Sequence, residues 1–237
     1  MNSDQKQALK QGADCLPLLG IAAAFAMVIA LYAALIYAPT ERIMGAVQRI
    51  FYLHISAAWV GFFAFFVAFA ASIAYLARRD HALDIWASAS VEIGVLFATG
   101  VLVSGSLWAR PIWNTWWTWD PRLTATLVMW IYYVGVLLVH SLVDDADTRA
   151  RYAAVLNIAG FANVPLVFMA IRWWRTIHPV LFTGEGMQLE TRMLWALVAS
   201  LVAFTLLYVT LLVYRVRLQR LADRVAQLRR EISGVLD

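Results

Sequence analysis

The sequence is short of charged residues, of cysteine and of phosphate-binding motifs. Only 14% of its 237 residues are charged, whereas an average soluble domain has about 25%, and this difference excludes a soluble globule. A single cysteine, Cys15, excludes a disulfide framework, a thiolate zinc site and a Cys-x-x-Cys redox motif. The chain contains no Gly-x-x-x-x-Gly-Lys-Ser/Thr loop, so any ATP hydrolysis belongs to another chain.

Apolar residues are abundant instead, at 62% of the chain, with a mean hydropathy of +0.70. Six apolar runs reach the roughly 20 helical residues needed to cross a hydrocarbon layer about 30 Å thick. Isolated strands would leave backbone groups unpaired in lipid, so we predict an all-α polytopic membrane protein with six transmembrane helices. The expected spans are Leu16–Ala38, Ile50–Ala77, Leu83–Ser106, Leu123–Val143, Tyr152–Ile171 and Met193–Tyr214.

Two features inside these spans carry structural expectations. Pro165 is expected to kink the fifth span, because proline lacks a backbone donor. Glu92 lies within the third span, where a carboxylate is costly. We expect it to be a protonated or hydrogen-bonded packing residue, with contact to a partner helix as the alternative.

An even number of spans places both termini on one side of the membrane, which we call face A. Face A carries twelve of the Lys and Arg residues and the opposite side, face B, carries seven. The positive-inside bias therefore predicts that face A is cytoplasmic. We expect residues 1–214 to form the membrane domain and residues 215–237 an amphipathic cytoplasmic helix, contacting lipid or a partner subunit. Its apolar positions are Leu218, Leu221, Val225, Leu228 and Ile232.

Face B collects the residues that indicate a binding site. His54 begins the second span, His178 lies in the last face B loop, and a tryptophan-rich loop over residues 107–122 lies between them in sequence. An interfacial aromatic belt explains one or two tryptophans per helix end. Five within twelve residues are better explained by a rigid aromatic shelf that binds a large, flat, apolar ligand. The five are Trp108, Trp113, Trp116, Trp117 and Trp119.

Four arginines near the shelf or the histidines indicate that this ligand is also anionic, since guanidinium groups bind carboxylates bidentately. They are Arg49, Arg110, Arg122 and Arg175. A flat macrocycle with carboxylate tails and a metal that accepts imidazole is haem, and His54 and His178 are its candidate axial ligands.

Two alternatives use haem differently. A cytochrome b-type redox subunit would bury haem between helices. Because His81 and His140 lie at face A, the sequence allows histidine pairs that span the membrane. A channel subunit would move haem through the bilayer. The shelf lies outside the expected membrane core, which favours capture at the surface.

The run from Trp113 to Thr124, WNTWWTWDPRLT, resembles the tryptophan-rich "WWD" signature of the haem-handling proteins of cytochrome c biogenesis. The segments around His54 and His178 are similar to the flanking-histidine motifs of that superfamily. Length and span number are similar to its small member, the cytochrome c maturation protein C (CcmC) family. Two residues depart from the family's common pattern. Asn114 stands in place of Gly and tolerates unusual φ values, and Pro121 stands in place of Ala and should stiffen the start of the fourth helix.

The resemblance implies a binding and delivery protein of the bacterial inner membrane, with no enzymatic activity of its own. It implies that haem b is held transiently at the periplasmic surface and passed to the haem chaperone CcmE. It also implies an ABC-type complex with the ATPase CcmA and the membrane subunits CcmB and CcmD.

The resemblance also assigns roles by position. His54 and His178 would be the axial ligands, and the tryptophans of the signature, together with Trp108, would form the haem platform. Arg49 and Arg122 would contact the propionates or a partner, and Asp120 would order the loop or face the chaperone.

Overall fold

The computed structural model describes residues 3–176, 178, 182–183, 186–187 and 189–236. Its described part is almost entirely helical and contains six helical segments long and apolar enough to cross a membrane, which confirms the predicted fold class. The helices are α1 (Ser3–Tyr32), α2 (Ile50–Arg78), α3 (His81–Trp113), α4 (Pro121–Leu142), α5 (Ala146–Gly160), α6 (Asn163–Trp173) and α7 (Thr191–Leu236). A π-helical turn (Ala33–Tyr37), a 3-10 turn (Ala46–Arg49) and the two-residue strands β1 (Phe182–Thr183) and β2 (Gly186–Met187) complete the order.

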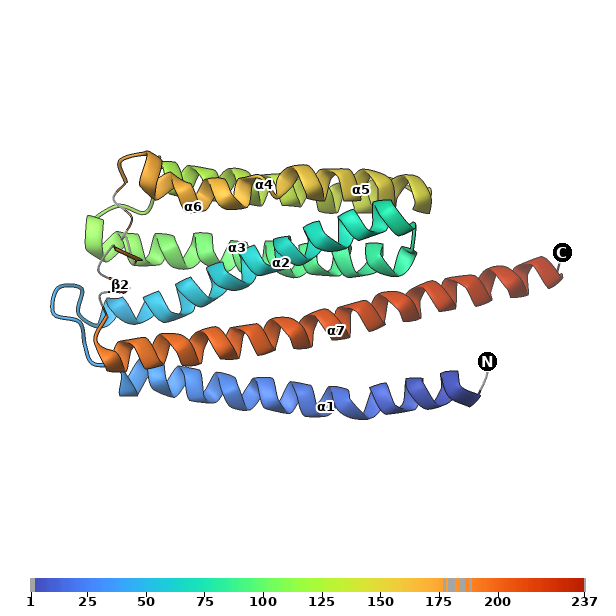
Figure 1. Ribbon diagram of the computed structural model, residues 1–237, viewed down its shortest axis with the longest axis horizontal. Helices are drawn as coiled ribbons and strands as arrows, with labels where there is room; N and C mark the ends of the chain where they lie inside the picture. The colour runs from blue at the N-terminus through green and yellow to red at the C-terminus, as the bar shows by residue number, and fades with distance from the viewer. Residues whose placement is uncertain (1–2, 177, 179–181, 184–185, 188, 237) are drawn as a thin grey trace.

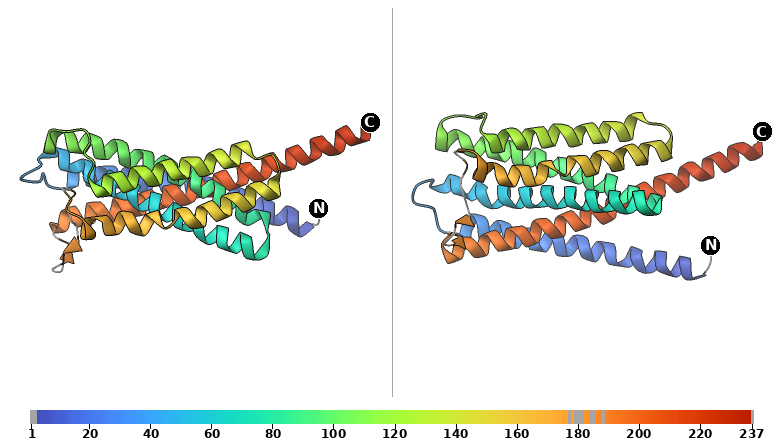
Figure 2. Two further views of the ribbon diagram at one scale, coloured as in Figure 1. Left: turned by 90° about the horizontal axis from the view of Figure 1, so that it is seen from above. Right: turned by 45° about the horizontal axis from the view of Figure 1, so that its top comes forward.

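The helices run side by side along the long axis, and both chain ends lie at the same end of the bundle (Figure 1). Helices α2 and α3 form the central hairpin. Helix α7 packs on one side of this hairpin and carries α1 on its outer side, while α4, α5 and α6 cover the other side (Figures 1 and 2). The connections that sequence analysis assigned to face B therefore meet at the end opposite the termini.

Short turns capped by aspartate join the helices at the terminal end. The Asp80 carboxylate accepts from the backbone N–H of Ala82 at 2.9 Å and begins α3. The Asp145 carboxylate accepts from the backbone N–H of Thr148 at 2.9 Å and begins α5. Each cap satisfies a backbone donor that the first helical turn leaves unpaired.

The fifth span is interrupted, as Pro165 predicts. Helix α5 ends at Gly160, a turn covers Phe161 and Ala162, and α6 begins at Asn163. A proline ring clashes with the carbonyl four residues earlier, which here belongs to Phe161. The freed groups find other partners: the Phe161 carbonyl accepts from the Val164 N–H at 3.0 Å, and the Asn163 amide donates to the Gly160 carbonyl at 3.3 Å.

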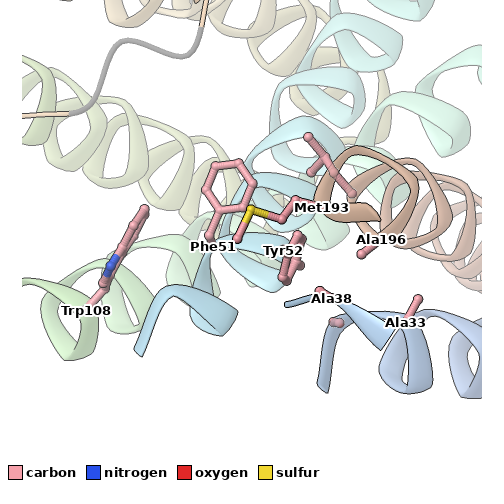
Figure 3. Close-up of a cluster of buried hydrophobic side chains, with 9 residues drawn as sticks. Ala33, Ala38, Phe51, Tyr52, Trp108, Met193 and Ala196 are labelled. Atoms are coloured by element: carbon pink, nitrogen blue, oxygen red, sulfur yellow. The ribbon is translucent and has the colours of Figure 1, made fainter. Parts of the chain in front are cut away.

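A hydrophobic cluster supports the end of the bundle that lies away from the termini (Figure 3). Phe51 and Tyr52 of α2 pack there with Met193 of α7, small residues from the end of the first span, and Trp108 of α3. Trp108 is only 5% exposed, so this tryptophan belongs to the packed core as well as to the predicted shelf.

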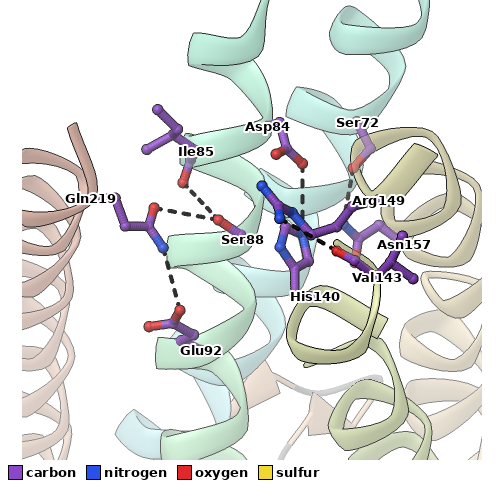
Figure 4. Close-up of polar contacts among 10 residues, drawn as sticks. All are labelled: Ser72, Asp84, Ile85, Ser88, Glu92, His140, Val143, Arg149, Asn157 and Gln219. Atoms are coloured by element: carbon purple, nitrogen blue, oxygen red, sulfur yellow. Dashed lines mark hydrogen bonds and ion pairs between the residues drawn. The ribbon is translucent and has the colours of Figure 1, made fainter. Parts of the chain in front are cut away.

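Polar side chains join neighbouring helices, and Figure 4 shows several of these contacts, among them that of Gln219 of α7 with Glu92 of α3. Glu92 forms a bidentate ion pair with Arg215 of α7, whose Nη2 donates to Oε1 at 2.7 Å. Gln219 donates to the same carboxylate at 3.3 Å. The costly carboxylate is therefore neutralised within the chain and joins α3 to α7.

Helix α7 continues without interruption from the sixth span into the tail, with no helix boundary near residue 214. The five apolar tail positions are exposed, as an amphipathic helix requires when nothing covers it. Of the two predicted regions, residues 1–2, 177, 179–181, 184–185, 188 and 237 lie outside the described residues.

Candidate functional site

A largely apolar pocket opens at the face B end between α2, α3, α4 and α6. His54, His178 and Arg122 supply its main polar groups, and apolar side chains such as Phe62, Met129 and Val167 form its deeper wall. The cavity therefore reaches between the helices, deeper than the predicted surface shelf.

The two candidate ligands converge on this pocket. The rings of His54 and His178 lie 6.4 Å apart between centroids, with 34° between their planes. A metal-bound imidazole nitrogen lies about 2.0 Å from the metal, so two imidazoles on opposite sides of one ion have centroids roughly 6 Å apart. Residues more than 120 positions apart in the sequence are thus placed at the spacing that joint ligation needs.

His54 is held firmly by helix α3. Its Nδ1 lies 2.9 Å from the Ser104 hydroxyl, its ring meets the Trp108 ring edge-on at 5.8 Å, and it is 6% exposed. Gly105 makes room for it, because a Cβ at that position would lie 3.1 Å from His54 Cε1. Sequence analysis missed Ser104 and Gly105. Their signal was the run of small residues Ser104-Gly105-Ser106 at the end of an apolar span.

The tryptophans divide into two sets. Trp108, Trp113 and Trp117 line the pocket. Trp116 and Trp119 are not among the described lining residues and are 56% and 76% exposed. The indole Nε1 of Trp108 is buried with no hydrogen-bond partner among the described residues. A buried donor beside a cavity fits a ligand that brings an acceptor.

This division arises because helix α3 extends to Trp113, so the connecting loop is shorter than the predicted range 107–122. Asn114 ends the helix in the left-handed region at φ 53°, as the tolerance of asparagine for unusual φ predicts. Pro121 occupies the first turn of α4. The Asp120 carboxylate caps that helix by accepting from the Arg122 N–H at 2.9 Å, a contact that orders the loop.

Of the four arginines, the described pocket lining includes Arg122 only. Its Nη1 lies 3.5 Å from Nδ1 of His178. The Arg49 guanidinium donates to the Leu35 carbonyl and so ties the end of the first span to the start of the second. Arg110 donates to the Asn114 carbonyl at 2.9 Å and lies over the Trp116 ring. Charge counts along the sequence could not separate these loop-bracing roles from ligand contact.

The other two histidines are engaged at the opposite end. His81 lies 3.1 Å from an Asp147 carboxylate oxygen, and His140 lies 3.6 Å from an Asp84 oxygen (Figure 4 shows the second pair). Each of these imidazoles thus faces a carboxylate, whereas the convergent pair is His54 and His178. This arrangement gives no support to the redox alternative with histidine pairs across the membrane.

Fold and pocket together define a polytopic membrane protein with a histidine-bearing, indole-lined binding site at one end of its helix bundle. The chain belongs to the heme exporter protein C family, whose family model matches residues 2–231. It is 37% identical over 219 residues to heme exporter protein C of Bradyrhizobium diazoefficiens, covering 91% of this chain and 82% of the relative. The Escherichia coli K12 protein of the same name is 34% identical over 204 residues, covering 85% and 82%.

A more distant relative comes from a plant. A putative cytochrome c biosynthesis ccmC-like mitochondrial protein of Marchantia polymorpha is 29% identical over 154 residues, which cover 65% of each chain.

Proposed function

We propose that this protein binds haem between His54 and His178 and passes it on during cytochrome c maturation. The observation that carries the proposal is the 6.4 Å spacing of the two imidazole rings in a pocket walled by three indoles. A porphyrin supplies four nitrogens to its iron, so the protein needs to supply only two axial ligands. The names of the relatives, heme exporter protein C and a cytochrome c biosynthesis protein, agree with this cargo.

Each pocket group has a role toward haem. The indoles of Trp108, Trp113 and Trp117 offer the apolar contact that a porphyrin needs, and the Arg122 guanidinium offers donors to a propionate. Haem is held and released, with the protein acting as a binding and delivery subunit and not as an enzyme. Loss of one axial bond, as an incoming ligand arrives, would begin the handover.

The wider setting follows the family resemblance and the charge distribution. Twelve Lys and Arg residues on face A against seven on face B favour a cytoplasmic face A. The pocket would then open at the periplasmic face of the bacterial inner membrane and deliver haem b to CcmE. CcmA would hydrolyse ATP, and CcmB and CcmD would complete the membrane complex.

Replacing either His54 or His178 with alanine tests the proposal. We expect each variant to insert into the membrane. Each should lose most of its bound haem, because only one of the two imidazole–iron bonds can still form. The measurement is the ratio of haem absorbance to protein after purification. His81→Ala is the matched control, since His81 pairs with Asp147 at the other end and should leave the ratio unchanged. Wild-type haem content in both pocket variants would reject the site.

The division of the tryptophans makes a second prediction. Trp117→Ala removes an indole that lines the pocket and should weaken haem affinity about 10-fold or more. Trp119→Ala removes an indole that is 76% exposed and should leave haem affinity close to wild type. Haem titration of both purified variants gives the comparison. Equal losses of haem affinity in the two variants would contradict the assignment of Trp117, and not Trp119, to the haem pocket.

A further inference from the structure

The two histidines are held by different partners, and this difference bears on how haem is released. We propose that His54, oriented by its hydrogen bond with Ser104, is the axial ligand that stays bound to the iron. His178 is then the ligand that is exchanged when haem arrives and leaves. This inference rests on the proposed function and deepens it, since it assigns unequal parts to the two ligands.

Hydrogen bonding fixes the orientation of His54. The Ser104 hydroxyl has one proton, and its oxygen lies 2.6 Å from the Gly100 carbonyl and 3.3 Å from the Val101 carbonyl. Carbonyl oxygens only accept, so the hydroxyl proton points to them. The Ser104 oxygen must therefore accept from Nδ1–H of His54 at 2.9 Å. In a neutral imidazole this places the free lone pair on Nε2, ready for a metal.

Packing holds the ring in this orientation. His54 lies on a long helix, is 6% exposed, and is confined between the Trp108 ring and the backbone of Gly105. A ring confined on both sides and bonded at Nδ1 reaches the iron without rearrangement, and its ligating form exists before haem arrives.

His178 has the opposite setting. It lies in the connection between α6 and α7, outside any helix, and is partly exposed. The Arg122 guanidinium lies 3.5 Å from its Nδ1 and can only donate. A donor at Nδ1 favours the tautomer whose proton is on Nε2, which cannot bind iron through that nitrogen. Ligation through Nε2 therefore requires His178 to exchange its contact with Arg122, a cost that His54 does not bear.

The consequence for transfer is directional. The bond to His178 breaks first, because its loss restores a contact with Arg122. The coordination position on that side of the porphyrin then opens to an incoming ligand, while His54 retains the iron from the other side.

The first test measures the midpoint potential of the haem-loaded full-length protein by optical redox titration. Ser104→Ala removes the acceptor for Nδ1–H, which makes His54 a weaker electron donor to iron, so we expect a raised potential. Ser104→Thr keeps a hydroxyl and should restore the wild-type value. Ser200→Ala is the matched control, because the buried Ser200 hydroxyl also donates to a helix carbonyl, that of Ala196 at 2.8 Å, and Ser200 is not among the described pocket-lining residues. An unchanged potential in Ser104→Ala, or an equal shift in Ser200→Ala, would overturn the role of Ser104.

The second test compares His178→Gly with His54→Gly. We expect His178→Gly to retain several-fold more haem than His54→Gly and to bind added free imidazole in the vacated position. More haem in His54→Gly would overturn the assignment of the exchanged ligand. Failure of the wild-type protein to show bis-histidine haem would instead reject the proposed function, so the two failures are distinguishable.

Discussion

Replacing Gly105 with valine is expected to weaken haem binding strongly although it removes no candidate ligand. A Cβ at position 105 would lie 3.1 Å from Cε1 of His54, closer than ordinary contact, and the two methyl groups of valine would reach further. The His54 ring is already bounded by Trp108 and bonded to Ser104, so it has to leave its orientation. We expect haem affinity to fall at least about 10-fold, as it does when groups that orient a metal ligand are altered.

Gly100 provides the matched control for this substitution. It lies on the same helix, and a Cβ there would meet no atom within 4 Å. Gly100→Val should therefore retain haem, and its carbonyl still accepts from Ser104. The measurement is haem titration of both purified variants, with helical content as the check on folding. Comparable affinities in the two variants would show that His54 has no need of the space at Gly105.

The largest loss of stability is expected from Gly160→Ala at the end of α5. A Cβ there would lie 2.3 Å from Cε1 of Tyr132, far inside van der Waals contact. Tyr132 cannot move away freely, because its hydroxyl donates to the Leu156 carbonyl at 2.8 Å and its ring packs edge-on against Tyr133. Overpacking of this kind costs roughly 1–3 kcal/mol.

Thermal unfolding in detergent measures this cost. Gly135→Ala on helix α4 is the control, because a Cβ at Gly135 would meet no atom within 4 Å. We expect a clearly lower melting temperature for the Gly160 variant and little change for the Gly135 variant. Equal melting temperatures would mean that α4 and α5 accommodate the added methyl group without a loss of stability.

Features governed by local chemistry were predictable from the sequence. Hydropathy located six spans, Pro165 predicted a kink in the fifth span, where the structure has a break, and the φ tolerance of Asn114 matched the left-handed end of α3. These predictions succeeded because each depends on a residue and its near neighbours along the chain.

Features governed by packing between helices were not predictable in the same way. Trp116 and Trp119 lie within two residues of Trp117 in the sequence, yet both are exposed and outside the described pocket lining, because α3 runs on to Trp113 before the chain turns. Arg49 carries the charge expected of an anion contact but braces the Leu35 carbonyl. The hydrogen bond between Ser104 and His54 depends on the packing of α3 against α2.

The break in the fifth span gives its two halves different anchorage. Helix α5 is fastened to the central hairpin, where the Asn157 amide donates to the Ser72 hydroxyl at 3.0 Å in a buried contact, whereas α6 packs chiefly on α4. Val167 of α6 and Arg122 of α4 both line the pocket, so α4 supports the pocket wall both directly and through α6.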